Sequence, residues 1–356
     1  MNTLESSLDE LFENEIQNES FPGAVVLVNY RGERIFHKAY GWRNRETDEP
    51  VEKDTVFDLA SVTKIITSSL ILKKVTEGKL QLNGMVGDLL TSLKNNEALA
   101  SITIQSLLTH SSGLKAWEPF YTHSDKSVFN ILDSMDVLHH EQHSVVYSDL
   151  NYILLGEILK ELEGKSLQAI VLKELVEPLQ LKKLSYKVAY TENVAATEYG
   201  NQIEMQMCNE RNRTFDSWRI QDQPIIGKVN DGNAFYFFGG ESGHAGLFGT
   251  AEDLEGLASI YLKGGLVGDK RLIDSRLIHA SMEAIAGNRG LGWHSGDPFP
   301  AGVGHTGFTG TSLWLYPEKD LHVTLLTNRL HVADPKNINP VRKKVHEVIM
   351  QHIVYY

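Results

Sequence analysis

The sequence has one cysteine, no long apolar run and no excess of positive charge. Because Cys208 is the single cysteine among 356 residues, no intramolecular disulfide can form, and nothing requires an oxidising compartment. No apolar stretch approaches the ~20 residues that a membrane-spanning helix needs. Acidic residues outnumber basic ones by 46 to 34, and the resulting formal charge of −12 argues against a nucleic-acid partner.

The first twenty residues lack the features of a secretory signal. They carry several acidic residues and no basic one, whereas a signal peptide needs a basic start and an apolar middle. As it stands, the sequence predicts a cytoplasmic protein, or an extracytoplasmic one if a leader has been removed. The apolar residues of this stretch recur at the spacing of an amphipathic helix: Leu4, Leu8, Leu11, Phe12 and Ile16.

Strand patterns lie near both ends of the chain. Residues 24–28 and 34–40 are rich in apolar and β-branched side chains and predict a hairpin. Residues 312–316 and 321–326 predict two more strands, joined by a turn at 317–320. One sheet can therefore be built from the two ends of the chain.

Helical periodicity dominates the middle of the chain. The segment 191–223 has little periodicity and predicts a long irregular loop. We therefore expect an α/β (α+β) fold. Residues 1–80 and 224–356 would form the sheet domain, and residues 81–223 a mainly helical inserted lobe, with the active site in the cleft between them.

Ser61 and Lys64 lie three residues apart at the start of an apolar, glycine-free helix. On one helix face, the serine hydroxyl and the lysine amine can point into the same pocket. This suits a nucleophile beside a proton acceptor, provided that the amine loses its proton easily, which burial near another cation favours. Alone, the pair is equally well explained as an N-cap serine and a surface lysine. The same spacing recurs at Ser112 and Lys115, where a turn follows and no helix holds the pair.

Tyr147 precedes another apolar helix, which begins close to Asp149. A phenol at that helix end could carry a proton from Ser61 to a leaving group. The plainer interpretation is a half-buried tyrosine beside an N-cap aspartate.

A glycine-rich stretch begins at His305, Thr306 and Gly307, just before the strand 312–316. Small residues at a strand edge let a substrate approach backbone N–H groups that can bind an oxyanion. Taken alone, the stretch is better explained as a turn.

Together, the order and spacing of these segments resemble the serine β-lactamase and penicillin-binding-protein superfamily. The resemblance is strongest to its class C β-lactamase-like branch, which includes esterases and D-amino-acid peptidases, and it extends from about residue 22 to residue 329. The matching segments are Ser61-Val62-Thr63-Lys64, Tyr147-Ser148-Asp149, His305-Thr306-Gly307, and the stretches 107–114, 243–248 and 327–329.

The resemblance implies an antiparallel sheet flanked by helices, with an all-helical lobe. It implies that Ser61 forms an acyl-enzyme, that Lys64 and Tyr147 share the general acid and base work, and that no cofactor or metal takes part. The N–H groups of Ser61 and Phe308 would form the oxyanion hole. The substrate-binding residues implied by the resemblance are Asp149, His305, Thr306 and Gly307.

Two departures from the family pattern affect the expected substrate. Asp149 stands where the family usually has asparagine, and a carboxylate cannot donate a hydrogen bond as an amide does. It could instead attract a substrate amine or pair with Lys64. His305 stands where lysine is usual, and a largely neutral histidine would bind a substrate carboxylate more weakly. A literal Y-x-N occurs at Tyr199-Gly200-Asn201, but within the irregular segment, so Tyr147 is preferred.

These departures favour a carboxylesterase or a D-amino-acid peptidase of DD-carboxypeptidase type, acting on a small molecule or short peptide. A β-lactamase or penicillin-binding protein of low activity is the alternative. A binding or regulatory protein that kept the fold and lost the chemistry is the alternative of another class, although the intact Ser61, Lys64 and Tyr147 argue against it. The sequence does not indicate the oligomeric state.

Two other enzyme classes match the sequence poorly. Gly240-Glu241-Ser242-Gly243-His244 approaches the G-x-S-x-G motif of α/β-hydrolases but ends in histidine. His139, His140 and His143 suggest a metal site, but the spacing is one residue short of H-E-x-x-H.

Overall fold

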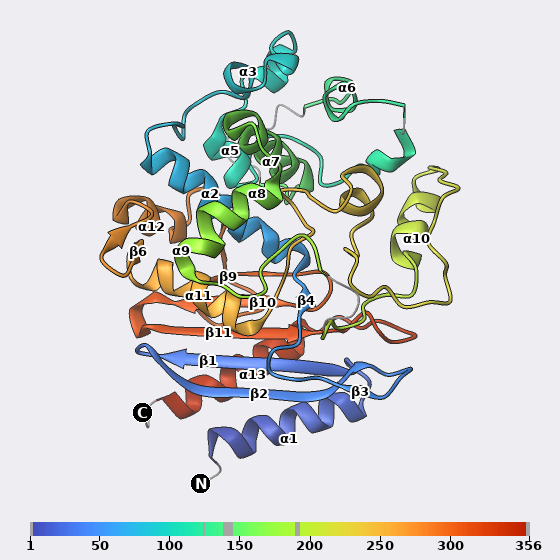
Figure 1. The fold of residues 1–356 in the computed structure, drawn as a ribbon, viewed down its shortest axis with the longest axis vertical. Helices are drawn as coiled ribbons and strands as arrows, with labels where there is room; N and C mark the ends of the chain where they lie inside the picture. Colours follow the sequence, from blue (N-terminus) through green and yellow to red (C-terminus); the bar gives the residue numbers. More distant parts are fainter. Residues whose placement is uncertain (1–2, 124, 138–144, 189–192, 354–356) are drawn as a thin grey trace.

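The structure is a computed structural model that describes residues 3–123, 125–137, 145–188 and 193–353. Its centre is a seven-stranded sheet in the order β3-β2-β1-β11-β10-β9-β8, with every neighbouring pair antiparallel (Figure 1). The predicted antiparallel sheet flanked by helices is therefore confirmed. The strands are β1 (Gly23–Tyr30), β2 (Glu33–Asn44), β3 (Glu49–Pro50), β8 (His294–Ser295), β9 (Val303–Thr306), β10 (Ser312–Tyr316) and β11 (Leu321–Thr327).

The two ends of the chain meet at the centre of the sheet, where β1 pairs with β11 and Val26 lies opposite Leu325. Alternate β1 residues enter different cores, because side chains alternate between the faces of a strand. Val26 packs with helices α1 (Leu4–Gln17) and α13 (Asn339–Ile353) on the outer face. Val25 packs with α2 (Thr63–Thr76) and α11 (Ala251–Leu262) on the other face. Figure 1 shows α2 and α11 on the side of the sheet opposite α1. Covering on both faces explains why β1 is apolar almost throughout.

Helices and loops lie beyond α2, on the face of the sheet opposite α1 and α13. The division of the chain at residues 80 and 224 into a sheet domain and an inserted helical lobe stays a prediction. The helices here are α3 (Val86–Leu89), α4 (Glu97–Ala100), α5 (Ile104–Leu108), α6 (Val128–Asp133), α7 (Asp149–Glu163), α8 (Leu167–Val171), α9 (Glu177–Leu179), α10 (Gln202–Glu210) and α12 (Ser275–Met282). The short helical turns are η1 (Ala60–Val62), η2 (Thr91–Leu93), η3 (Phe120–His123), η4 (Leu172–Val176), η5 (Asn233–Phe237) and η6 (Pro317–Lys319). The remaining short strands pair as β4 (Phe57–Asp58) with β5 (Phe248–Gly249) and β6 (Leu266–Val267) with β7 (Lys270–Arg271).

Several element boundaries differ from the sequence prediction. The segment 191–223, expected to be irregular, contains α10, whose buried Glu204 and Cys208 face the protein interior. β9 and β8 were not expected, because runs of four and two residues carry no visible alternation. Helix α11 begins with a capping box: the Thr250 hydroxyl accepts from the Asp253 N–H, and the Asp253 carboxylate accepts from the Thr250 N–H.

No helix within the described ranges combines the length and the apolar character needed to cross a bilayer.

Candidate active site

Ser61 lies in the short turn η1, directly before the buried helix α2. The preceding residue, Ala60, has a φ of 45°, in the left-handed region that residues with a Cβ rarely adopt. The Asp58 carboxylate holds this turn by accepting from the Ala60 N–H at 2.8 Å and from the Asn230 N–H at 2.6 Å. Burial raises the pKa of Asp58 to about 6. The position of Ser61 is therefore set by a strained turn and a buried carboxyl group.

Lys64 lies beneath Ser61 with its side chain fully buried. Its Nζ donates to Ser61 Oγ at 3.0 Å and to the His244 carbonyl at 3.0 Å, and it lies 2.8 Å from Asp149 Oδ1. An ammonium group has three N–H donors, and these three oxygens use all of them. The serine and lysine on one helical face are thus in contact.

The charge of Lys64 differs from the sequence expectation. A base at this position would have to lose its proton easily, which a neighbouring cation favours, but the neighbour is the Asp149 carboxylate. Burial disfavours the ammonium, yet the Asp149 charge, followed by Tyr147, outweighs burial and raises the pKa of Lys64 above its ordinary value of 10.5. The expectation of an easily lost proton was therefore wrong, and Lys64 is a cation at neutral pH.

Tyr147 lies between two cations at the mouth of the site. The Lys64 Nζ is 5.0 Å from the centre of its ring, and the Arg289 guanidinium carbon is 5.2 Å from it. The N-cap of α7 is Ser148, and Asp149 is the first helical residue rather than the cap. Its carboxylate pairs with Lys64, one of the two uses that the sequence suggested.

His305 and Thr306 belong to strand β9, so only the residues that follow form the predicted glycine-rich turn. Hydroxyl groups fasten this turn to the chain before Ser61, because Thr309 Oγ1 donates to the Asp58 carbonyl at 2.7 Å and Thr311 Oγ1 donates to the Leu59 carbonyl at 2.9 Å.

Gly307 has no room for a side chain. A Cβ at this position would lie 2.1 Å from Thr311 Oγ1 and 2.6 Å from the Leu59 oxygen. The next residue, Phe308, is 42% exposed at the rim. Among the described residues, no acceptor binds the Phe308 N–H, which leaves it available to a substrate oxygen.

His305 is buried and uncharged. Burial, followed by the nearby His294, holds the pKa of His305 well below its usual range, and its Nε2 has no hydrogen-bond partner among the described residues. The family usually has a lysine at the position of His305. In this protein the positive charge of that lysine is supplied instead by Arg289, which lines the same cavity. Sequence reasoning missed Arg289 because it lies in a loop outside every recognised motif.

Two cavities meet at Ser61, Tyr147 and Phe308, which line both. The larger, about 590 Å³, also contains His305, Thr306 and Gly307. The smaller, about 170 Å³, contains Asp149. The structure thus gathers the predicted site residues around one point, with Lys64 beneath. A further cavity of about 730 Å³, near Arg34 and His322, contains none of them and has no groups arranged for acyl transfer.

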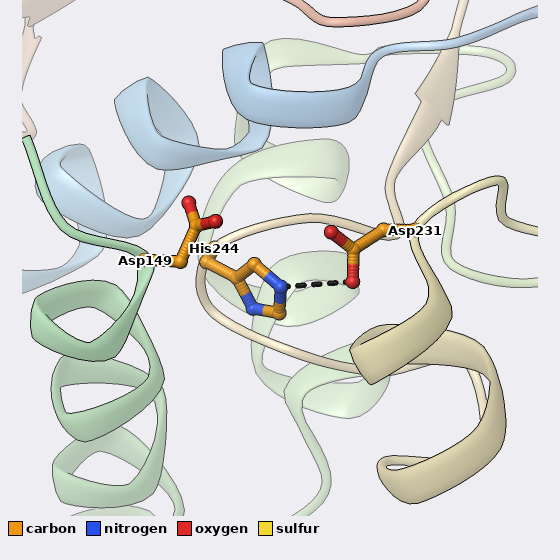
Figure 2. A group of neighbouring side chains, drawn as sticks. All are labelled: Asp149, Asp231 and His244. Atoms are coloured by element: carbon orange, nitrogen blue, oxygen red, sulfur yellow. Dashed lines mark hydrogen bonds and ion pairs between the residues drawn. The ribbon is translucent and has the colours of Figure 1, made fainter. Parts of the chain in front are cut away.

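Asp149, Asp231 and His244 offer ligand atoms within 4.8 Å of one another, a geometry that a metal ion could use (Figure 2). Each group already has a partner. Figure 2 shows the bond from His244 Nε2 to Asp231 Oδ1, 3.0 Å long, while His244 Nδ1 contacts Ser242 Oγ and Asp149 pairs with Lys64. The adjacent ammonium would also repel a cation. Hydrogen bonding explains this cluster without a metal. The candidate metal-binding residues His139, His140 and His143 lie outside the described residues.

The second serine–lysine pair and the Y-x-N motif form contacts with other residues, away from Ser61. Ser112 Oγ donates to Asn151, and Lys115 forms an ion pair with Glu118, so this second serine–lysine pair is not assembled. In the Y-x-N copy, Tyr199 stacks on His331 and Asn201 donates to the Asn230 carbonyl.

Comparison with known proteins agrees with this architecture. The family model described as Beta-lactamase matches residues 8–347. The chain is 31% identical over 375 residues to the N-acetylmuramyl-L-alanine amidase of Bacillus subtilis (strain 168), covering 94% of this chain and 83% of that protein.

Solved structures show the same fold. EstCE1, a hydrolase with promiscuous acyltransferase activity, has a TM-score of 0.75 at 19% identity, covering 97% of this chain and 98% of its own. The class C β-lactamase from Rhodobacter sphaeroides has a TM-score of 0.74 at 21% identity, and the match covers 97% of this chain and 99% of that chain. The chain therefore belongs to the β-lactamase family and is a hydrolase of that family.

Proposed function

We propose that this protein is a serine hydrolase that cleaves an ester or amide through an acyl-enzyme on Ser61. The observation that carries the proposal is the contact of the buried Lys64 ammonium with Ser61 Oγ at 3.0 Å. Burying a charge costs free energy, and the protein has to offset that cost with Asp149 and Tyr147 placed beside Lys64. A cation placed at this cost against a serine oxygen favours a catalytic role over a structural one.

Lys64 acts as a fixed cation in this proposal. Its three donors are bound to Ser61, His244 and Asp149, so it stabilises the developing Ser61 alkoxide and has no free lone pair. Tyr147, at the junction of both cavities, carries the proton. This divides the acid and base work that the family resemblance assigned jointly to Lys64 and Tyr147.

The reaction has two halves. In this proposal Ser61 Oγ gives its proton to the deprotonated oxygen of Tyr147 and attacks the carbonyl carbon, while the N–H groups of Ser61 and Phe308 bind the oxyanion. The bond to the leaving oxygen or nitrogen breaks, and Tyr147 gives the proton to that atom and is deprotonated again. Water then gives a proton to Tyr147 and attacks the acyl group, the carbon–Oγ bond breaks, and Tyr147 passes that proton to Ser61 Oγ as the carboxylic acid leaves.

The substrate class is a small ester or amide, as for a carboxylesterase or a D-amino-acid peptidase of DD-carboxypeptidase type. The amidase named among the relatives supports cleavage of amides. Asp149 pairs with Lys64 and does not offer the amide N–H that the family pattern provides. This supports little activity on β-lactams, which a chromogenic cephalosporin tests directly.

The test combines turnover with labelling. A p-nitrophenyl ester, a fluorescent penicillin and a D-amino-acid amide are assayed, and intact mass after fluorophosphonate treatment locates the adduct. Ser61→Ala should lose at least about 10⁴-fold in kcat and all labelling. Ser112→Ala, in the unassembled copy of the motif, is the matched control and should keep both. Equal turnover by Ser61→Ala would reject the nucleophile, and neither adduct nor turnover with any probe would favour the binding-protein alternative.

A further inference from the structure

We propose that the site selects a zwitterionic substrate, a dipeptide or similarly short peptide with a free ammonium group on the acyl side of the scissile bond and a free carboxylate on the leaving group. This rests on the proposed Ser61 hydrolase function and specifies its substrate class. It follows from an acidic cavity and a basic cavity that meet at the nucleophile.

The smaller cavity is acidic. Asp149, Glu204 and Asp231 line it, and its lining among the described residues contains no lysine, arginine or histidine. Lys64 neutralises Asp149 from beneath. Burial works against the Asp231 carboxylate, but its contact with His244 Nε2 at 3.0 Å lowers the pKa of Asp231 and keeps it ionised. Lys64 Nζ lies between Asp149 and Ser61 Oγ, so the negative charge that a substrate ammonium can meet comes from the deeper carboxylates of this cavity.

Glu204 adds a carboxyl group whose charge can respond to a ligand. Its oxygens accept from the Tyr121 hydroxyl at 2.9 Å and the Gly232 N–H at 2.6 Å, and no cation pairs with it among the described residues. Burial, with the Asp231 charge second, raises the pKa of Glu204 to about 8. A substrate ammonium beside it would favour the ionised form, which strengthens the attraction.

The larger cavity is basic. Arg289, Arg329 and Arg342 line it, and no aspartate or glutamate of the described ranges does. Two of these guanidinium groups are occupied by the protein: Arg329 donates to backbone carbonyls, and Arg342 to carbonyls and to Asn339. The Arg289 guanidinium carbon lies 5.2 Å from the centre of the Tyr147 ring.

A buried donor in this cavity has no acceptor. Among the described residues, Arg289 Nε has no hydrogen-bond partner. Leaving a buried polar group unpaired is unfavourable, and a carboxylate offers lone pairs that can satisfy an arginine fork. The cavity is therefore suited to an anionic group.

Ser61, Tyr147 and Phe308 line both cavities, so a carbonyl at Ser61 places the acyl part in one and the leaving group in the other. A free dipeptide carries its ammonium on the acyl residue and its carboxylate on the departing one. The volumes agree, since the acidic cavity of about 170 Å³ accepts only a small acyl group and the basic one of about 590 Å³ a larger leaving group.

Matched substrates test the proposal. Alanyl-alanine in its four stereochemical forms is compared with its N-acetyl and C-terminal amide derivatives, with kcat/KM measured by product mass spectrometry. Blocking either charge should lower kcat/KM of the best stereoisomer at least about tenfold, the loss expected of one charge-assisted hydrogen bond. Equal hydrolysis of free and blocked peptides would overturn the proposal.

Variants that remove one charge each test which cavity binds the substrate's ammonium group and which binds its carboxylate. Glu204→Gln should reduce the preference for the free over the acetylated amine, and Arg289→Gln the preference for the free over the amidated carboxylate. Ratios within one variant cancel any general loss of activity or folded protein. The controls are Glu210→Gln on the same helix and Arg276→Gln on α12, both exposed. Unchanged ratios in Glu204→Gln and Arg289→Gln would overturn the assignment.

A neutral p-nitrophenyl ester separates this proposal from the underlying function. Ser61-dependent ester turnover without any charge preference among the peptides would reject the zwitterion while the hydrolase stands. No Ser61-dependent turnover of any substrate would reject both.

Discussion

Replacing Asp149 with asparagine tests whether Lys64 works as a fixed cation or as a base. The substitution keeps the shape of the side chain and removes a charge 2.8 Å from Lys64 Nζ. At that separation and an effective dielectric constant of about 20, two unit charges attract by about 6 kcal/mol. The dipole of the asparagine amide oxygen still attracts the ammonium, so we take the loss of attraction as half of the full value. That loss is about 3 kcal/mol, which corresponds to about two pKa units for Lys64.

The pH profile of hydrolysis shows the shift. In the wild-type protein the pKa of Lys64 lies above 10.5, because the Asp149 and Tyr147 charges outweigh burial. Lys64 is therefore protonated, and kcat/KM for p-nitrophenyl acetate should not fall up to about pH 10. In Asp149→Asn the pKa of Lys64 drops by about two units, so the alkaline fall of kcat/KM should begin about two pH units lower than in the wild-type protein, as the stabilising cation is lost.

The opposite result would refute the reasoning. If neutral Lys64 were the base, the variant would contain more of the active form at pH 7, and kcat/KM there would rise. A rise at pH 7, or an alkaline limb of kcat/KM at the same pH as in the wild-type protein, rejects the fixed cation. Asp269→Asn, in the exposed turn between β6 and β7, controls for the change in net charge. Thermal unfolding verifies that both variants are folded.

Three further changes test the surrounding structure. Gly307→Ala should lower kcat about 100-fold, because a methyl group 2.1 Å from Thr311 Oγ1 pushes the oxyanion turn away from the nucleophile; ester kinetics within threefold of wild type would contradict this. Burial, then a nearby charge, raises the folded-state pKa of Glu204 to about 8 from 4.5, so this group's contribution to stability is lost as pH rises between those values. Between pH 4.5 and pH 8, the free energy of unfolding of Glu204→Gln in urea should therefore rise by on the order of 4 kcal/mol relative to that of the wild-type protein. A difference between the two proteins that stays constant with pH would refute the shift in the pKa of Glu204. Thr250→Ala should lower the free energy of unfolding by about 1 kcal/mol through loss of the α11 cap; an equal loss in Thr250→Ser would argue against capping.

Elements defined by local pattern were predictable. The leucines of α1 recur at helical spacing and pack on the sheet, and the run 321–326 became β11 because its side chains are buried on both faces. The Thr250 cap needs only residues three apart. Such features depend on neighbours along the chain, which the sequence displays directly.

Short or non-periodic elements were not predictable in the same way. β8 and β9 exist because β9 pairs with β10 and β8 pairs with β9, and a strand of two to four residues has no period of its own. Helix α10 is mostly polar, and only a few of its positions, Glu204 and Cys208 among them, are buried. Pairing and burial of this kind are decided by segments distant in sequence.

The sequence by itself determined the family, the sheet built from both chain ends and the three segments that supply Ser61, Tyr147 and His305. Residue type and order carry that information. Only the tertiary structure decided the charge of Lys64, because Asp149 lies 85 positions away in sequence and 2.8 Å away in space. The same holds for Arg289, which no motif marks and which supplies the positive charge that the neutral His305 lacks. Electrostatic interactions depend on distance through space, and that distance is set only when the chain folds.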